Sequence, residues 1–233
     1  NIFIKDWADI NIDQPRSFFN SSNWLVNLLT FFAGAIMTLA YAPFDWWFIP
    51  FISLTFLFYC CQKSFNPKQS AMRGFYFGLG WFGVGVSWVH VSIADFGGIP
   101  IIASLALMLL LASYLALFPA LAMFLAKRFN KHFSTFSFVL AWVISEWLRS
   151  WLLTGFPWLS IGYSQLTSPL AEFAPVIGEF GLQVIVLFIC VSFLNKKKFV
   201  PLLTCIFIFN LAWALTLLNW TVPNPTSNEP KKI

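Results

Sequence analysis

Charged residues are scarce in this sequence of 233 residues. Aspartate, glutamate, lysine and arginine together make up 10% of the chain, against about 25% in an ordinary soluble domain. Hydrophobic residues make up 59%, and the mean hydropathy is +0.75. So few charges cannot cover that much apolar surface in water, which excludes a water-soluble globular fold. The composition predicts that lipid surrounds most of the chain.

Residues that commonly carry covalent or metal chemistry are also few, with four cysteines and two histidines. The cysteines lie inside apolar runs, without the polar surroundings that make a thiol reactive, so we expect small core residues. His90 and His132 lie on opposite sides of the predicted bundle and cannot share a metal. Neither a P-loop nor a G-x-S-x-G motif occurs. We predict no catalytic residue, no metal, no cofactor and no nucleic-acid partner for this chain. The four cysteines are Cys60, Cys61, Cys190 and Cys205.

What the sequence does contain is a series of long apolar windows. About 20 apolar residues cross the hydrocarbon core of a bilayer, and a spanning segment must pair its backbone groups internally, so each window predicts a helix. The predicted fold class is an all-α integral membrane protein, a bundle of about seven transmembrane helices. We expect residues 24–219 to form the membrane domain, between a cytoplasmic arm (1–23) and a periplasmic linker (220–233). The windows are 24–41, 47–61, 74–92, 100–126, 136–153, 173–194 and 199–219.

Lysine and arginine are missing from every second connection between the windows. Because basic loops stay in the cytoplasm, the basic connections predict a cytoplasmic N-terminus and a C-terminal tail on the opposite side of the membrane. The basic residues are Lys63, Lys68 and Arg73 after the second window, Lys127, Arg128 and Lys131 after the fourth, and Lys196, Lys197 and Lys198 after the sixth.

One outward connection, "TGFPWLSIGYSQLTSP" (154–169), is rich in turn-forming and aromatic residues. Glu146 and Arg149 precede it, three residues apart on one predicted helix, so they share a face and can pair. Ionisable residues in membrane spans are candidates for function. Two interpretations stay open: an ion pair that orients helices, or a polar pocket for a lipid headgroup or carbonyl.

The sequence "GLGWFG" (78–83) matches G-x-G-x-x-G, but it lies inside an apolar window rather than in a strand–turn–helix unit. We therefore exclude a dinucleotide site. The glycines of this window are expected to let another helix approach closely. They are Gly74, Gly78, Gly80, Gly83 and Gly85.

Several stretches, in this order, resemble the membrane domain of bacterial apolipoprotein N-acyltransferases, from about residue 28 to the tail. They are "LAYAPFDWW", "RGFYFGLGWFGVGVSWVHVSIADFGGIP", "LASYLALFPAL" and "SEWLRSWLLTGFPWLSIGYSQLTSPLAEFAPVIGEFGL". The resemblance implies an enzyme of the bacterial inner membrane with a phospholipid as acyl donor. The acceptor is the N-terminal amine of diacylglyceryl-cysteine in a lipoprotein.

The resemblance also implies that the catalytic residues lie in a nitrilase-like periplasmic domain. The sequence stops at "NEPKKI", where that domain would begin, so we expect a piece of a longer protein that is inactive by itself. What the resemblance assigns to this chain is lipid and substrate binding. Aromatic side chains would pack acyl chains, and polar ones would bond esters or phosphate. The candidate residues are Glu146, Arg149, Phe156, Trp158, Tyr163 and Gln165.

Two other function classes remain. A small-solute transporter would suit several spans with an internal ion pair, but no inverted repeat or matching pair of broken helices is visible. A non-catalytic membrane anchor or relic would suit a chain without catalytic residues. Flux through liposomes separates the transporter from the enzyme.

Overall fold

The computed structural model describes residues 21–133, 136–195 and 199–217, and within these ranges every regular element is helical. Our predictions for the arm (1–23) and for the linker (220–233) lie almost entirely outside them. The long helices are α1 (Ser21–Met37), α2 (Ile49–Gln62), α3 (Pro67–Gly85), α4 (Val89–Gly97), α5 (Ile101–Phe133), α6 (Phe136–Arg149), α7 (Ala174–Ser192) and α8 (Phe199–Leu215). Short 3-10 turns lie between them: η2 (Thr38–Ala40), η3 (Leu152–Thr154), η4 (Ile161–Gln165) and η5 (Pro169–Phe173).

Each of the seven apolar windows contains a helix, which confirms the predicted all-helical class for the described residues. By length and composition, three stretches could each cross a membrane: Asn23–Ala40, Ile101–Phe129 and Pro169–Ser192. The pair α3 and α4 could form a fourth span, bent by 49°. Helices α2 and α8 are apolar but shorter. A total of seven spans therefore stays a prediction.

The window 74–92 differs most from expectation. Helix α3 begins earlier, because Asn66 caps its N-terminus by accepting a hydrogen bond from the Gln69 N–H at 2.8 Å and Pro67 suits the first helical position. The chain then bends before α4. Gly98, the residue that follows α4, has a φ of 64°, a value that glycine adopts at little cost.

Aromatic side chains join three helices at the centre of the bundle. Trp81 stacks on Trp142 at a centroid distance of 6.3 Å, and Trp142 meets Phe58 edge-on at 5.8 Å. All three rings are buried. Because such rings bury a large apolar area and prefer defined geometries, they fix α2, α3 and α6 in one core.

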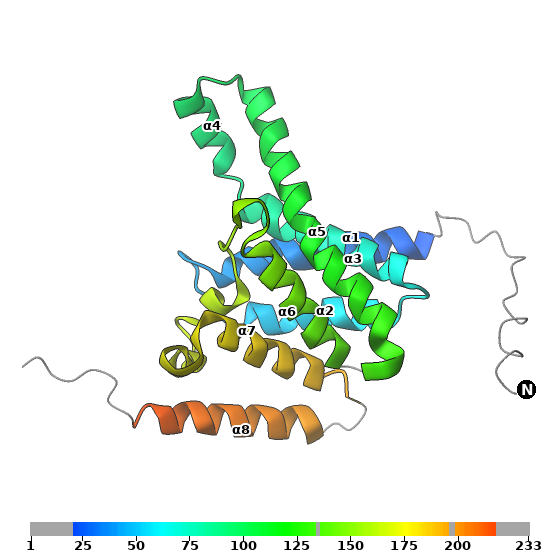
Figure 1. Ribbon diagram of the computed structural model, residues 1–233, viewed down its shortest axis with the longest axis vertical. Helices are drawn as coiled ribbons and strands as arrows, with labels where there is room; N and C mark the ends of the chain where they lie inside the picture. The colour runs from blue at the N-terminus through cyan, green and yellow to red at the C-terminus, as the bar shows by residue number, and fades with distance from the viewer. Residues whose placement is uncertain (1–20, 134–135, 196–198, 218–233) are drawn as a thin grey trace, which may run out of the picture.

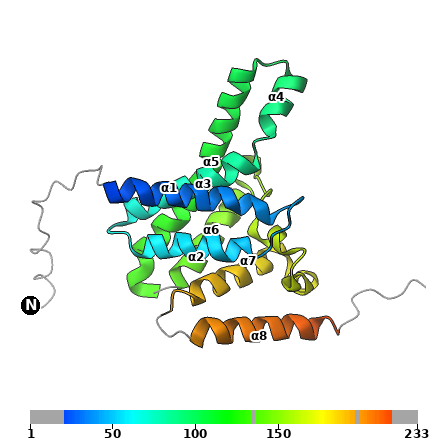
Figure 2. The ribbon, with the colours of Figure 1, turned by 180° about the vertical axis from the view of Figure 1, so that it is seen from behind.

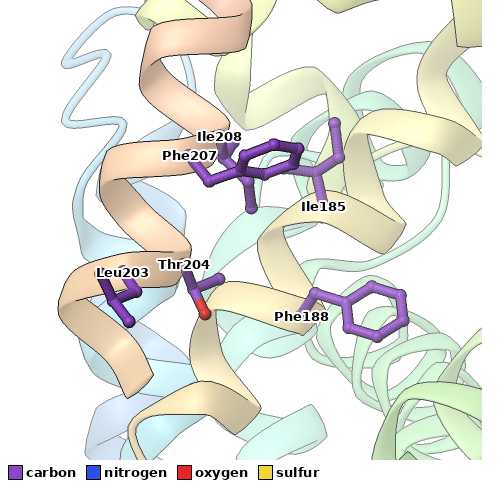
Figure 3. Close-up of a pocket in the computed structure, with 6 residues that line it drawn as sticks. All are labelled: Ile185, Phe188, Leu203, Thr204, Phe207 and Ile208. Atoms are coloured by element: carbon purple, nitrogen blue, oxygen red, sulfur yellow. The ribbon is translucent and has the colours of Figure 1, made fainter. Parts of the chain in front are cut away.

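Two parts of the molecule stand out from this core (Figures 1 and 2). The hairpin of α4 and the first turns of α5 projects away from the bundle. At another edge, α8 lies along α7. Figure 3 shows the shallow groove between α7 and α8, which is apolar except for one threonine. The groove is lined by Ile185, Phe188, Leu203, Thr204, Phe207 and Ile208.

Candidate functional site

The candidate site lies in the segment that joins α6 to α7. The chain reverses tightly after α6, with the Phe156 N–H donating to the Arg149 carbonyl at 3.0 Å. Gly155 has a φ of 78°, and a Cβ there would lie 2.1 Å from the Ser150 carbonyl oxygen, so the turn requires glycine. Leu153 and Leu159 also adopt positive φ values of 51° and 60°. Such backbone persists only where its surroundings hold it in place.

Glu146 and Arg149 form a buried ion pair at the end of α6. Their side chains are 4% and 2% exposed. The Arg149 guanidinium donates from Nε to Glu146 Oε1 at 2.9 Å and from Nη2 to Oε2 at 2.5 Å. Two parallel bonds of this kind are stronger and more directional than a single contact. The pairing predicted from the spacing is therefore confirmed.

Arg149 also holds the turn that follows it. Its Nη1 donates to the Trp158 carbonyl at 2.9 Å and to the Phe156 carbonyl. The guanidinium lies over the Phe82 ring, 5.5 Å from its centroid. Arg149 thus connects α6, the reversed turn and the core aromatic residues of α3.

Gln165 fastens the far end of the segment. Its Nε2 donates to the Trp47 carbonyl at 3.1 Å and to Ser164 Oγ at 2.9 Å, and its side chain is fully buried. Tyr41 also anchors the segment, because its hydroxyl donates a hydrogen bond to the Leu159 carbonyl at 2.8 Å.

The three aromatic candidates lie on the outside of this polar framework. Trp158 is 54% exposed and Tyr163 is 45% exposed, while Phe156 is half-buried. Trp158 stacks on Trp88 at 5.2 Å and contacts Phe156 at 5.8 Å. The structure therefore divides the candidates into a buried set that shapes the segment (Glu146, Arg149, Gln165) and an aromatic shelf (Phe156, Trp158, Tyr163).

Sequence reasoning missed part of the polar framework. Ser160 donates to the Glu179 carboxylate and lies 3.3 Å from Gln183 Oε1. Glu179 is an ionisable residue inside an apolar window, the same signal that pointed to Glu146. It follows Gly178, whose φ of 67° interrupts α7 at this point. Nothing in the sequence marks Ser160.

Two buried polar atoms of this region have no hydrogen-bond partner among the described residues, namely Gln165 Oε1 and Gln183 Nε2. Buried polar atoms are nearly always paired, so a water or a ligand hydroxyl would suit both. Direct lipid binding by any of the six candidates stays a prediction.

The four cysteines form no second site with other side chains of the described residues. Cys60, Cys61 and Cys190 are buried, which confirms the predicted core position for these three, whereas Cys205 is only partly buried; all four are free thiols. Among the residues with assigned positions, no three metal-ligating side chains come together.

Comparison with known proteins decides the family. The domain family described as "Apolipoprotein N-acyltransferase N-terminal domain" matches residues 33–192, which include the whole α6–α7 segment. The chain belongs to the apolipoprotein N-acyltransferase family.

Several relatives named apolipoprotein N-acyltransferase are similar over most of this chain. The relative from Photobacterium profundum is 42% identical over 220 residues, covering 91% of this chain and 42% of its own length. Those from Coxiella burnetii and Vibrio cholerae are 41% and 40% identical, over 86% and 82% of this chain and 44% and 39% of their own lengths. The chain thus spans about four tenths of the apolipoprotein N-acyltransferases that it matches.

Proposed function

We propose that this chain is the membrane part of an enzyme that transfers an acyl chain from a phospholipid to a lipoprotein. The acceptor is the N-terminal amine of diacylglyceryl-cysteine. The observation that carries the proposal is the family match over residues 33–192, together with the shared name of relatives about 40% identical. Membership of the apolipoprotein N-acyltransferase family does not favour a small-solute transporter. Inactivity of this chain by itself stays a prediction.

The geometry supports a binding role for the α6–α7 segment. Tryptophan and tyrosine side chains suit the boundary between headgroups and acyl chains, and Trp158 and Tyr163 are exposed beside apolar helices. The buried bonds of Arg149 hold the backbone of Phe156 and Trp158, two of the three shelf residues, in one position. A donor lipid held at a fixed depth reacts without a search for the correct geometry.

The distribution of charge supports an orientation in the bacterial inner membrane. Lys63, Lys68 and Arg128 lie at one end of the bundle, and Glu172 and Glu179 lie towards the other. By the positive-inside rule, the basic end is cytoplasmic and the α6–α7 segment is periplasmic. We propose that residues 24–219 form a single membrane domain with this orientation.

The test uses a full-length apolipoprotein N-acyltransferase that carries the same residues at the equivalent positions. Trp158→Ala removes the exposed ring of the shelf, so we expect it to raise the donor concentration needed for half-maximal transfer. Glu146→Ala leaves Arg149 buried without its partner, so we expect it to reduce both transfer and the amount of folded protein. The measurement is the rate of acyl transfer to a diacylglyceryl peptide across donor concentrations in mixed micelles.

The matched control is Trp147→Ala. Trp147 is equally exposed on α6 and packs against Trp151 rather than against the shelf. It should therefore behave like the unaltered enzyme. If Trp158→Ala and Glu146→Ala both keep normal rates at every donor concentration, the segment has only a structural role.

A further inference from the structure

A second unusual group of charges lies at the opposite end of the bundle from the candidate site. The end of α2, the start of α3 and the C-terminal end of α5 meet on one side of the molecule (Figures 1 and 2). Arg73 of α3 and Lys127 of α5 both bond to the last turn of α2, and we call these two residues the α2 cation pair. The pair plays no part in the function proposed above.

The contacts of the α2 cation pair are with neutral groups. Arg73 Nη1 donates to the Cys60 carbonyl and to Ser64 Oγ at 2.9 Å. Lys127 Nζ donates to the Gln62 carbonyl at 2.8 Å. Cations commonly cap the C-terminal carbonyls of a helix, which carry about half a negative charge in total. Two full positive charges exceed that amount, so capping leaves most of the charge uncompensated.

No carboxylate in the described part of the chain offsets this charge. Among the described residues the only ion pair is Glu146 with Arg149, which lies at the opposite end of the bundle. Arg73 is 6% exposed, and its Nε is buried without a hydrogen-bond partner. Ser70 Oγ, one turn earlier on α3, is also buried and unpaired. Buried charges are normally paired, and among the described residues no anion pairs with Arg73.

The surroundings of the pair favour the phosphate of a lipid. Lys63 and Lys68 are exposed in the α2–α3 turn and on the first turn of α3, where the positive helix end adds to the attraction. Phe65, in the same turn, is 75% exposed. Exposed basic residues beside an exposed aromatic ring suit a membrane surface, where the ring enters the lipid and the cations meet phosphates.

We propose that the α2 cation pair, with Lys63 and Lys68, binds the phosphate of an anionic glycerophospholipid. The lipid belongs to the leaflet at the basic end of the bundle. Its phosphate supplies the negative charge that the described residues do not, and its acyl chains lie along the apolar faces of α2 and α3. The bound lipid fixes the end of α2 against α3 and α5.

The test measures lipid retention by the chain in nanodiscs of phosphatidylcholine with or without phosphatidylglycerol. The readouts are native mass spectrometry and the midpoint of thermal unfolding. For the unaltered chain we expect bound phosphatidylglycerol and a higher midpoint in its presence. Lys127→Gln, a partly exposed position, should lower the apparent affinity about fivefold, the effect of removing one cation near a membrane surface. Arg73→Lys should retain more binding than Arg73→Gln.

Arg128→Gln is the matched control, because it removes the same charge from an exposed residue adjacent to Lys127. Equal loss of lipid in Arg128→Gln and Lys127→Gln would overturn the proposal, since it would indicate only general attraction. Inorganic phosphate that raises the midpoint as much as phosphatidylglycerol would overturn the assignment to a lipid. Because Lys127→Gln does not alter the buried Arg73, the test stands even if Arg73→Gln fails to fold.

Discussion

At the scale of single residues, Arg149 shows how one side chain can organise a membrane segment. Its guanidinium bonds to the Glu146 carboxylate and to the carbonyls of Phe156 and Trp158. Every one of these partners belongs to the same chain, so the arginine is bound before any lipid arrives. Its part in lipid binding would thus be to position the Trp158 ring.

Removing one member of the buried pair should be strongly destabilising. We expect Arg149→Gln to lower the free energy of unfolding by about 3–5 kcal/mol, because Glu146 would remain buried without its partner. The measurement is unfolding of the reconstituted chain by sodium dodecyl sulfate, followed by tryptophan fluorescence. The double variant Glu146→Met with Arg149→Met should recover only part of the loss, since two carbonyls still lack a donor. Full recovery would show that Arg149 does not hold the turn.

At the scale of elements, glycine decides how closely the helices approach. A Cβ on Gly80 would lie 2.0 Å from the Phe31 carbonyl oxygen of α1, and one on Gly78 would lie 2.7 Å from the Ala116 Cα of α5. The sequence predicted this close packing for the α3 glycines, and the prediction is confirmed at these positions. It is wrong for Gly83, where a Cβ would meet nothing within 4 Å.

Gly80 and Gly83 therefore make a matched pair of variants. Gly80→Ala must separate α1 from α3, so we expect a loss of about 1–3 kcal/mol, typical of overpacking. Gly83→Ala should be neutral or stabilising by up to about 1 kcal/mol, because alanine favours the helix. Unfolding in sodium dodecyl sulfate compares the two. Equal effects of the two substitutions would show that the approach of α1 does not limit the size of the residue at position 80.

The elements also show what sequence could and could not predict. Each apolar window correctly predicted a helix, because the length of an apolar run can be read directly from the sequence. The bend between α3 and α4 and the reversed turn after α6 were not predicted. They depend on contacts between distant segments, such as the Tyr41 hydroxyl on the Leu159 carbonyl, and on the positive φ of Leu153 and Leu159. Glu146 and Arg149 were identifiable as rare charges, whereas their bonding to backbone carbonyls was not.

At the scale of the whole molecule, the separation of basic and acidic side chains predicts which end faces the cytoplasm. Lys68 and Thr167 are exposed at opposite ends of the bundle. In a background carrying Cys205→Ser, the remaining native thiols are buried. We expect a membrane-impermeant maleimide to label the Thr167→Cys variant in intact spheroplasts and the Lys68→Cys variant only after lysis. The reverse pattern would contradict the proposed orientation and place the aromatic shelf in the cytoplasm.

The projecting hairpin of α4 and α5 has a consequence for the mechanics of the protein. Helix α4 has no buried residue, and its principal neighbour is α5. If the hairpin lies in the bilayer, acyl chains rather than protein pack against its side chains. We therefore expect the angle of the hairpin to change with bilayer thickness and to differ between a bilayer and a detergent micelle.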